Sequence, residues 1–134
     1  MEAVECYNKA LTINPSYVKA LHNKGYTLAK LDKNHEAIES YSKALKIDSN
    51  DIVALYNKGN ALKELGKYQE AIKCYDKALK IDPKFIYAWN NKGSAFTKLE
   101  KLQEAIECFD KALTIDPKHE PSLKAKKEIL EAKK

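Results

Sequence analysis

The sequence repeats itself every 34 residues. When the chain is aligned with itself at this spacing, small, aromatic and glycine positions coincide. The sets are Ala37, Ala71 and Ala105; Tyr7, Tyr41, Tyr75 and Phe109; and Gly25, Gly59 and Gly93. A fixed period of this length is typical of arrays that stack one short structural unit several times, so each unit completes its core against its neighbours.

Each repeat contains two amphipathic helical patterns. In the first half of the middle repeat, Leu55, Gly59 and Leu62 recur at spacings of four and three, which places them on one helical stripe. In the second half, Ala71 and Tyr75 follow the same spacing. The glycines and alanines predict a close approach of the two helices of one repeat, and the large residues are expected to fill the space between repeats.

The turn between the two helices is marked by Gly66, which suits the left-handed conformation that commonly ends a helix. The matching positions in the neighbouring repeats hold Asp32 and Glu100. Because glutamate tolerates that conformation poorly, we expect the third turn to be built differently.

Proline marks the end of the second helix in two repeats, at Pro83 and Pro117. Ser49 stands at this position in the first full repeat. Ser49, Asn50 and Asp51 are each candidates to cap the helix that follows.

These residues together resemble the tetratricopeptide repeat over nearly the whole chain. The third repeat carries the full signature in Trp89, Gly93, Phe96, Ala105, Phe109, Ala112 and Pro117. A systematic departure is a lysine before each glycine, where the family usually has leucine. The resemblance implies an all-α fold, an α-solenoid of antiparallel helix pairs in a right-handed superhelix.

We predict a single array over residues 1–134 with seven helices. Its parts are a partial repeat at 2–17, repeats at 18–51, 52–85 and 86–119, and a capping helix at 120–134. The first helix should expose an apolar edge that includes Val4, Tyr7 and Leu11. Of two explanations, a chain cut from a longer array is favoured over an edge that docks on another chain.

The charge pattern argues against nucleic acid as a partner. The net charge is +5, but all 24 basic residues are lysine, and arginine supplies the planar fork that reads bases and clamps phosphates. No apolar run is long enough to span a membrane, so no membrane association is expected. Three cysteines without a CxxC motif indicate a reducing compartment, and we expect a cytoplasmic protein.

No motif in the sequence points to catalysis. His22, His35 and His119 lie far apart in the repeat, and none has a nucleophile at a suggestive spacing. The cysteines at Cys74 and Cys108 are expected to be structural thiols. We therefore predict no enzyme, no catalytic residue, no cofactor and no metal site.

The resemblance implies a partner-binding groove lined by the first helices, and helical spacing selects the residues opposite the core stripe. The predicted groove residues are Lys19, His22, Asn23, Tyr26, Lys30, Val53, Tyr56, Asn57, Asn60, Lys63, Tyr87, Asn90, Asn91, Ser94 and Lys98. The asparagine ladder at 23, 57 and 91 offers amides to a peptide backbone, and the tyrosines offer aromatic anchors. Each feature also has an alternative explanation. The asparagines could bond to the backbones of neighbouring helices, the tyrosines could be packing residues, and the lysines could simply be solvated.

The leading hypothesis is a protein–protein interaction scaffold that holds a peptide or helix of a partner in this groove. The excess of lysine favours an acidic ligand. The carboxylate clamp of chaperone-tail binders is matched only at Asn57, which argues against that subtype. The alternative is a self-association module that forms homo-oligomers through terminal helices, and RNA binding is a third, less favoured class.

Overall fold

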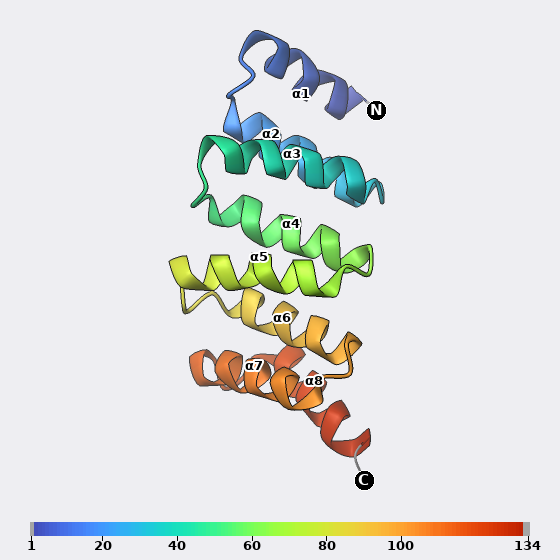
Figure 1. Ribbon diagram of the computed structural model, residues 1–134, viewed down its shortest axis with the longest axis vertical. Coiled ribbons are helices and arrows are strands. Elements are labelled where there is room, and N and C mark those ends of the chain that lie inside the picture. Colours follow the sequence, from blue (N-terminus) through green and yellow to red (C-terminus); the bar gives the residue numbers. More distant parts are fainter. Residues whose placement is uncertain (1, 133–134) are drawn as a thin grey trace. The chain divides into compact units, whose positions relative to one another are not determined.

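The computed structural model describes residues 2–132, and these form eight α-helices and no strand (Figure 1). The helices are α1 (Glu2–Ile13), α2 (Val18–Lys30), α3 (Asn34–Ile47), α4 (Ile52–Glu64), α5 (Tyr68–Ile81), α6 (Ile86–Lys98), α7 (Leu102–Ile115) and α8 (Glu120–Ala132). The predicted number of seven was one too few, because one helix of a partial repeat, three pairs and a capping helix make eight. None of these helices combines the length and the apolarity that a membrane crossing requires.

The chain falls into two compact units, which we call the N-terminal unit (α1–α4) and the C-terminal unit (α5–α8). Within the N-terminal unit each helix packs on the next, and α2 also contacts α4. Within the C-terminal unit the pattern recurs, and α6 contacts α8. In each unit, two helices that occupy the first position of a repeat therefore lie side by side, with a second helix packed against both.

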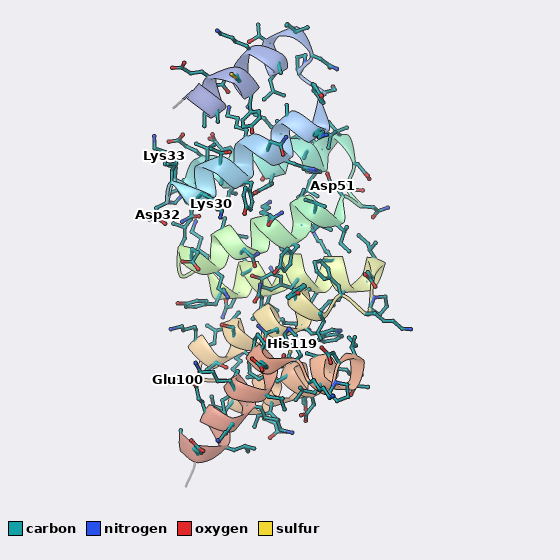
Figure 2. All side chains as sticks on the ribbon, turned by 180° about the vertical axis from the view of Figure 1, so that it is seen from behind. Lys30, Asp32, Lys33, Asp51, Glu100 and His119 are labelled. Carbon is teal, nitrogen blue, oxygen red and sulfur yellow. The ribbon has the colours of Figure 1, made fainter. Side chains whose placement is uncertain are left out.

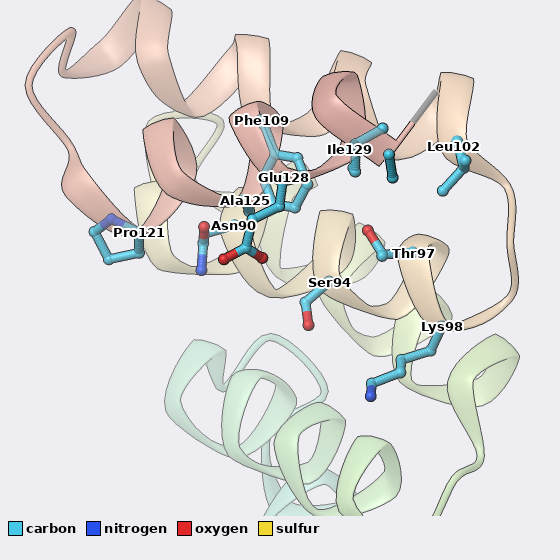
Figure 3. Close-up of a pocket in the computed structure, with 11 residues that line it drawn as sticks. Asn90, Ser94, Thr97, Lys98, Leu102, Phe109, Pro121, Ala125, Glu128 and Ile129 are labelled. Atoms are coloured by element: carbon cyan, nitrogen blue, oxygen red, sulfur yellow. The ribbon is translucent and has the colours of Figure 1, made fainter. Parts of the chain in front are cut away.

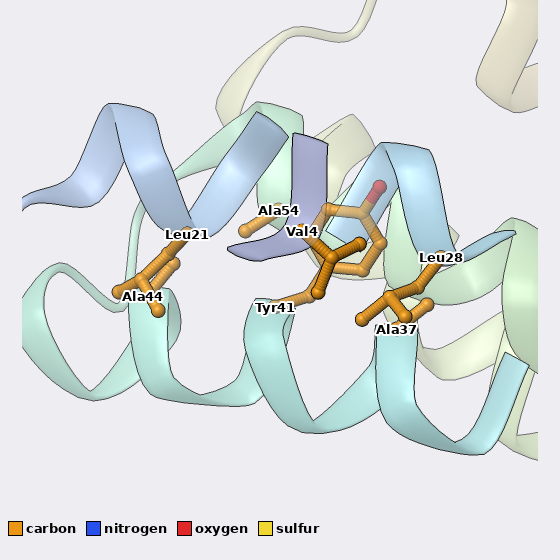
Figure 4. Close-up of a cluster of buried hydrophobic side chains, with 7 residues drawn as sticks. All are labelled: Val4, Leu21, Leu28, Ala37, Tyr41, Ala44 and Ala54. Atoms are coloured by element: carbon orange, nitrogen blue, oxygen red, sulfur yellow. The ribbon is translucent and has the colours of Figure 1, made fainter. Parts of the chain in front are cut away.

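The core of the N-terminal unit centres on Tyr41, which is only 1% exposed. Figure 4 shows Leu21 and Leu28 on either side of its ring, with Ala37 on the same helix as Tyr41. A β-carbon added at Gly25 would lie 2.7 Å from this ring. Tyr41 was expected to fill space between repeats. In the structure its ring lies over Gly25 of its own repeat.

The same contact is repeated in the C-terminal unit. A β-carbon at Gly93 would lie 2.7 Å from the ring of Phe109, which is also 1% exposed. Real β-carbons essentially never come this close to another heavy atom. The glycine in the first helix is thus required by the ring of the second helix, which confirms the close approach predicted for the pair.

The expectation that α1 exposes Val4 is wrong. Val4 is only 7% exposed, because it joins the buried cluster that includes Tyr41 and Leu21 (Figure 4). Tyr7 and Leu11 are half-buried. The exposed residues of α1 include Ala3, Cys6 and Ile13 instead.

The three turns between paired helices have the same geometry, so the expectation of a different third turn is also wrong. Asp32 and Glu100 both have φ 60°, and Gly66 has φ 77°. In each turn the amide after this residue donates to a carbonyl of the preceding helix, as Lys101 N does to Phe96 O over 2.9 Å. The hydrogen bonds of this cap hold Glu100 in a conformation that its own preference disfavours.

The connections between repeats also share one geometry. The residues Asn14, Asp48, Asp82 and Asp116 each accept a hydrogen bond on the side-chain oxygen from the amide two residues later, over 3.0–3.1 Å. This local turn forms with or without a following proline, so Ser49 does not alter it. Of the three candidate caps, Asp51 is the one that caps α4, because its Oδ1 accepts from Ala54 N over 3.1 Å.

In the C-terminal unit, the lysine at the position where the family usually has leucine forms an ion pair with the preceding second helix. Lys92 Nζ lies 2.6 Å from Asp76, and Lys126 Nζ, one repeat later, lies 2.6 Å from Asp110. The Lys92 ammonium also lies 5.2 Å from the centre of the Trp89 ring. The Lys92 stem covers apolar surface while its charge reaches a carboxylate, which accounts for the departure in this repeat.

Candidate binding site

The N-terminal unit contains a pocket of about 290 Å³ between α2, α3 and α4. Its lining residues are Tyr26, Ala29 and Lys30 of α2, Asn34 and Tyr41 of α3, and Asn57, Asn60, Ala61 and Glu64 of α4. The buried Tyr41 forms part of this surface. The pocket thus opens on the side of the first helices where the groove was predicted.

The C-terminal unit contains a pocket of about 430 Å³ between α6, α7 and α8. Its lining residues are Asn90, Ser94, Thr97, Lys98, Leu102, Phe109, Pro121, Ala125, Glu128, Ile129 and Ala132 (Figure 3). Figure 3 shows lining residues from α6, among them Ser94 and Lys98, and from α8, among them Ala125 and Glu128.

The two pockets occupy the same place in the repeat. Every residue that lines the smaller pocket has a counterpart two repeats later in the larger one. The pairs are Tyr26 and Ser94, Ala29 and Thr97, Lys30 and Lys98, Asn34 and Leu102, Tyr41 and Phe109, Asn57 and Ala125, Asn60 and Glu128, Ala61 and Ile129, and Glu64 and Ala132. The fold therefore builds one cavity twice, from a first helix, its paired second helix and the next first helix.

The two pockets differ in chemistry although they share a position. Asn34 and Asn57 of the smaller pocket are replaced by Leu102 and Ala125 in the larger one. Ile129 adds a further apolar side chain. The smaller pocket therefore offers amide hydrogen bonds, and the larger one offers an apolar surface.

The charges at each pocket are balanced. Lys30 and Glu64 line the smaller pocket, and Lys98 and Glu128 line the larger one. The Lys30 ammonium lies 5.1 Å from the centre of the Tyr26 ring, a distance typical of a cation–π contact. Tyr26 is 53% exposed, so its ring is accessible beside the pocket.

Seven of the fifteen predicted groove residues line one of the two pockets. They are Tyr26, Lys30, Asn57 and Asn60 in the N-terminal unit, and Asn90, Ser94 and Lys98 in the C-terminal unit. Lys19, Asn23 and Val53 are exposed outside the pockets, and Tyr56, Lys63 and Asn91 are half-buried there. Two others, His22 and Tyr87, make contacts within the fold.

His22 links two repeats. Its Nε2 lies 2.5 Å from Oδ2 of Asp51, whose other oxygen caps α4. Figure 2 labels Asp51 at the start of α4. The imidazole is therefore occupied in holding α2 against the start of α4.

Asn90 fastens α8 to α6 through a chain of hydrogen bonds. Ser122 is fully buried, and its hydroxyl donates to Asn90 Oδ1 over 3.0 Å. That hydroxyl then accepts from Nδ1 of His119 over 2.8 Å, which assigns the proton of the ring to Nδ1. The exposed ring of Tyr87 packs edge-on against His119, with 5.7 Å between ring centres (His119 is labelled in Figure 2).

Sequence reasoning missed the pocket residues that lie on second helices or on α8. Tyr41 and Leu102 belong to second helices, and Ala125, Glu128 and Ile129 belong to α8. The signal that could have found the α8 residues was present, because the 34-residue register continues from α6 into residues 120–132.

Burial raises the pKa of two titratable groups of the fold. Burial raises the pKa of Tyr41 to about 12, and the neighbouring Tyr26 adds to the effect. Burial likewise raises the pKa of the Cys108 thiol to about 11, where it is a poor nucleophile. Within residues 2–132, no group of three or more His, Cys, Asp or Glu side chains is placed to hold a metal ion.

Comparison with known families identifies the class of the protein. The model of the tetratricopeptide repeat matches residues 52–85 and 86–119, and a second TPR repeat model matches residues 1–32 and 30–66. The chain belongs to the tetratricopeptide repeat family, and the all-α solenoid class expected for it is confirmed.

Solved structures give the particular relatives, and no curated protein matches the chain significantly in sequence. A structure of MamA protein matches 97% of this chain and 71% of its own, with a TM-score of 0.90 and 25% identity. YrrB, titled a TPR protein with an unusual peptide-binding site, matches over 92% and 64%, with a TM-score of 0.86 and 28% identity. The first TPR of Spaghetti (RPAP3), bound to an HSP90 peptide, matches over 86% and 91%, with a TM-score of 0.82 and 26% identity.

Proposed function

We propose that this chain is a non-enzymatic scaffold that binds an extended or helical segment of a partner protein across its first helices. The fold supports a protein–protein interaction scaffold, and solved relatives of this class include one bound to a peptide. The single observation that carries the proposal is the recurrence of one cavity at equivalent positions two repeats apart. Each unit thus offers one such cavity, which suits a side chain or a short stretch of a bound segment.

The chemistry of the pockets narrows the kind of segment. The smaller pocket suits a polar side chain or a peptide group that bonds to Asn57 and stacks beside Tyr26. The larger pocket suits an apolar side chain against Leu102 and Ile129. Each pocket holds one lysine and one glutamate, so an acidic segment would be attracted chiefly by lysines outside the pockets, such as Lys19.

Binding to peptides selected from a random bead-displayed library tests this proposal. The peptide that binds the parent chain best is synthesised, and its affinity is measured by titration calorimetry. We expect Tyr26→Ala/Asn57→Ala to weaken binding about tenfold or more, because aromatic and amide groups in a pocket are typical hot spots.

The matched control is Tyr17→Ala/Asn50→Ala, which also replaces one tyrosine and one asparagine, both exposed and outside the two pockets. This control should bind as the parent does. Equal affinity of the pocket variant and the parent for every selected peptide would contradict the site. Raising the salt from about 0.05 to about 0.5 M should weaken acidic peptides selectively if the exposed lysines contribute.

A further inference from the structure

The smaller pocket contains three polar side chains that the fold does not use for its own hydrogen bonds. Asn34 and Tyr41 are only 9% and 1% exposed, and Asn57 is half-buried. Within residues 2–132, none of these three side chains forms a hydrogen bond or an ion pair. Asn34 does not act as a helix cap either, because Lys33 holds the cap position of α3.

The hydroxyl of Tyr41 opens into this pocket. Among residues 2–132, every side-chain nitrogen or oxygen that is sealed from water has a hydrogen-bond partner. The Tyr41 hydroxyl (Figure 4) has no partner, so water must reach it, and the pocket is the surface that Tyr41 lines. With a pKa of about 12 it stays protonated at neutral pH and can both donate and accept. Because a polar group so deeply buried loses stability without a partner, a ligand that bonds to it is favoured.

The equivalent pocket of the C-terminal unit lacks all three polar groups. The counterparts two repeats later are Leu102, Phe109 and Ala125 (labelled in Figure 3), whose side chains form no hydrogen bonds. The fold therefore builds the same cavity without these groups. All three are polar in one pocket and all three are apolar in the other, as expected for groups that serve one ligand together.

The donors and acceptors of the smaller pocket fit a carboxamide. Each asparagine offers an NH₂ donor and a carbonyl acceptor, and the phenol hydroxyl offers both. A carboxamide presents two donor hydrogens and a carbonyl oxygen, so it can bond to all three groups at once. A carboxylate would meet Glu64 at the same pocket and an ammonium would meet Lys30, whereas a neutral group suits both. Ala29 and Ala61 supply apolar walls for the methylene groups of a side chain.

We propose that the smaller pocket recognises the carboxamide side chain of a glutamine in the bound segment. This inference rests on the proposed function, because it names the side chain that one pocket of the scaffold selects. The two methylene groups of glutamine let its amide reach Asn34 and Tyr41 behind the exposed Tyr26, while the backbone of the segment stays outside. A side chain without the amide is rejected, because the polar groups of the pocket then lose water without gaining a partner.

Three small probes of similar size test this choice on the full 134-residue chain. They are the N-acetyl, N-methylamide derivatives of glutamine, glutamate and methionine, which share both peptide groups and differ at the end of the side chain. Titration followed by ¹⁵N–¹H NMR gives the dissociation constant of each. We expect the glutamine probe to bind at least about tenfold more tightly than the other two, and to shift the side-chain amide signals of Asn34 and Asn57.

A triple variant gives the smaller pocket the side chains of the larger one. Asn34→Leu/Tyr41→Phe/Asn57→Ala should fold, because the same fold already holds these residues in the equivalent pocket, and far-UV circular dichroism checks this. Its affinities for the glutamine and methionine probes should differ by less than about twofold. If the triple variant does not fold, Tyr41→Phe and Asn57→Ala measured singly should each weaken binding of the glutamine probe about threefold or more.

The control makes the same three exchanges outside both pockets. Asn8→Leu/Tyr17→Phe/Asn50→Ala changes exposed residues only and should keep the preference of the parent for glutamine. Library peptides selected by the parent should carry glutamine at one recurring position. Replacing that glutamine with methionine should weaken binding to the parent about tenfold and leave binding to the triple variant unchanged.

Two results would overturn the glutamine site. The first is equal affinity of the parent for the three probes, and the second is a folded triple variant that keeps the preference. Because the probes contain no partner segment, these results differ from failure of the scaffold itself. A chain that captures library peptides through Tyr26 and Asn57 but does not distinguish the probes remains a scaffold and contradicts the glutamine site alone. Preference for the glutamine probe without capture of any library peptide contradicts the bound segment, and with it both proposals.

Discussion

Replacing Gly25 with alanine sets two known effects against each other in one helix. Gly25 lies inside α2, where alanine is favoured over glycine by about 1 kcal/mol in helix propensity. The new β-carbon, however, would stand 2.7 Å from two carbons of the Tyr41 ring and 3.1 Å from a third. Because that ring is 1% exposed and packed between Leu21 and Leu28, it has little room to move.

Overpacking of this kind destabilises a core by about 1–3 kcal/mol, which exceeds the gain in propensity. We therefore expect Gly25→Ala to lower the free energy of unfolding by about 0.5–2 kcal/mol, and Tm by about 2–8 °C. Urea denaturation followed by circular dichroism measures the change. Asn23→Ala introduces alanine on the exposed side of the same helix, away from the ring, and should be neutral or slightly stabilising.

A double-mutant cycle identifies the ring as the cause. Tyr41→Leu alone removes packing, but in the presence of Gly25→Ala it also removes the obstacle. The double variant should therefore be more stable than the sum of the single losses, by about 0.5–3 kcal/mol. A Gly25→Ala chain at least as stable as the parent, or additive losses in the cycle, would refute this account of the repeat.

Three further predictions concern stability. Glu100→Gly should stabilise the chain by about 0.5–1 kcal/mol in urea denaturation, since glycine adopts φ 60° without strain, and Glu100→Ala should not. Ser42→Asp should raise the free energy of unfolding by about 0.2–1 kcal/mol, because Ser42 and Lys58 stand one repeat before the observed Asp76–Lys92 pair. This gain should disappear in high salt, and the control Ser42→Asn should show no gain. The free energy of unfolding should fall as the pH rises from about 9 to about 12. Cys108 and Tyr41 stay protonated in the folded chain, with pKa values of about 11 and about 12, but ionise at lower pH in the unfolded chain. Tyr41→Phe should lose the upper part of this fall, on the order of 2 kcal/mol, and an unchanged pH profile of this variant would contradict the prediction.

The sequence was sufficient to predict the helices and their pairing, because the 34-residue period and the apolar stripes are local patterns. Glu100 shows where intrinsic preference misleads. Its residue type disfavours the left-handed turn, but the hydrogen bonds that join Lys101 to Phe96, and the two helices on either side, impose it. Val4 was misjudged because the face of α1 that packs on α2 cannot be separated from its open face by periodicity alone.

The candidate site was predicted only in part, since helical spacing selects a face but not the partners of each side chain. His22 and Asn90 were assigned to the groove by spacing. The first is bonded to Asp51, 29 residues away, and the second to Ser122, 32 residues away. Such bonds depend on how two helices are placed, which no local pattern encodes. Tyr41 was missed as a pocket wall for the same reason.

The four connections at Asn14, Asp48, Asp82 and Asp116 are each closed by a bond between neighbouring residues of the loop itself. The conformation of such a connection is therefore set by its own residues and does not depend on the repeats that follow it. A cut made there, with a 34-residue cassette inserted or removed, would leave every remaining bend intact. Changes in the length of an array by gene duplication are therefore easiest to accommodate at these joints.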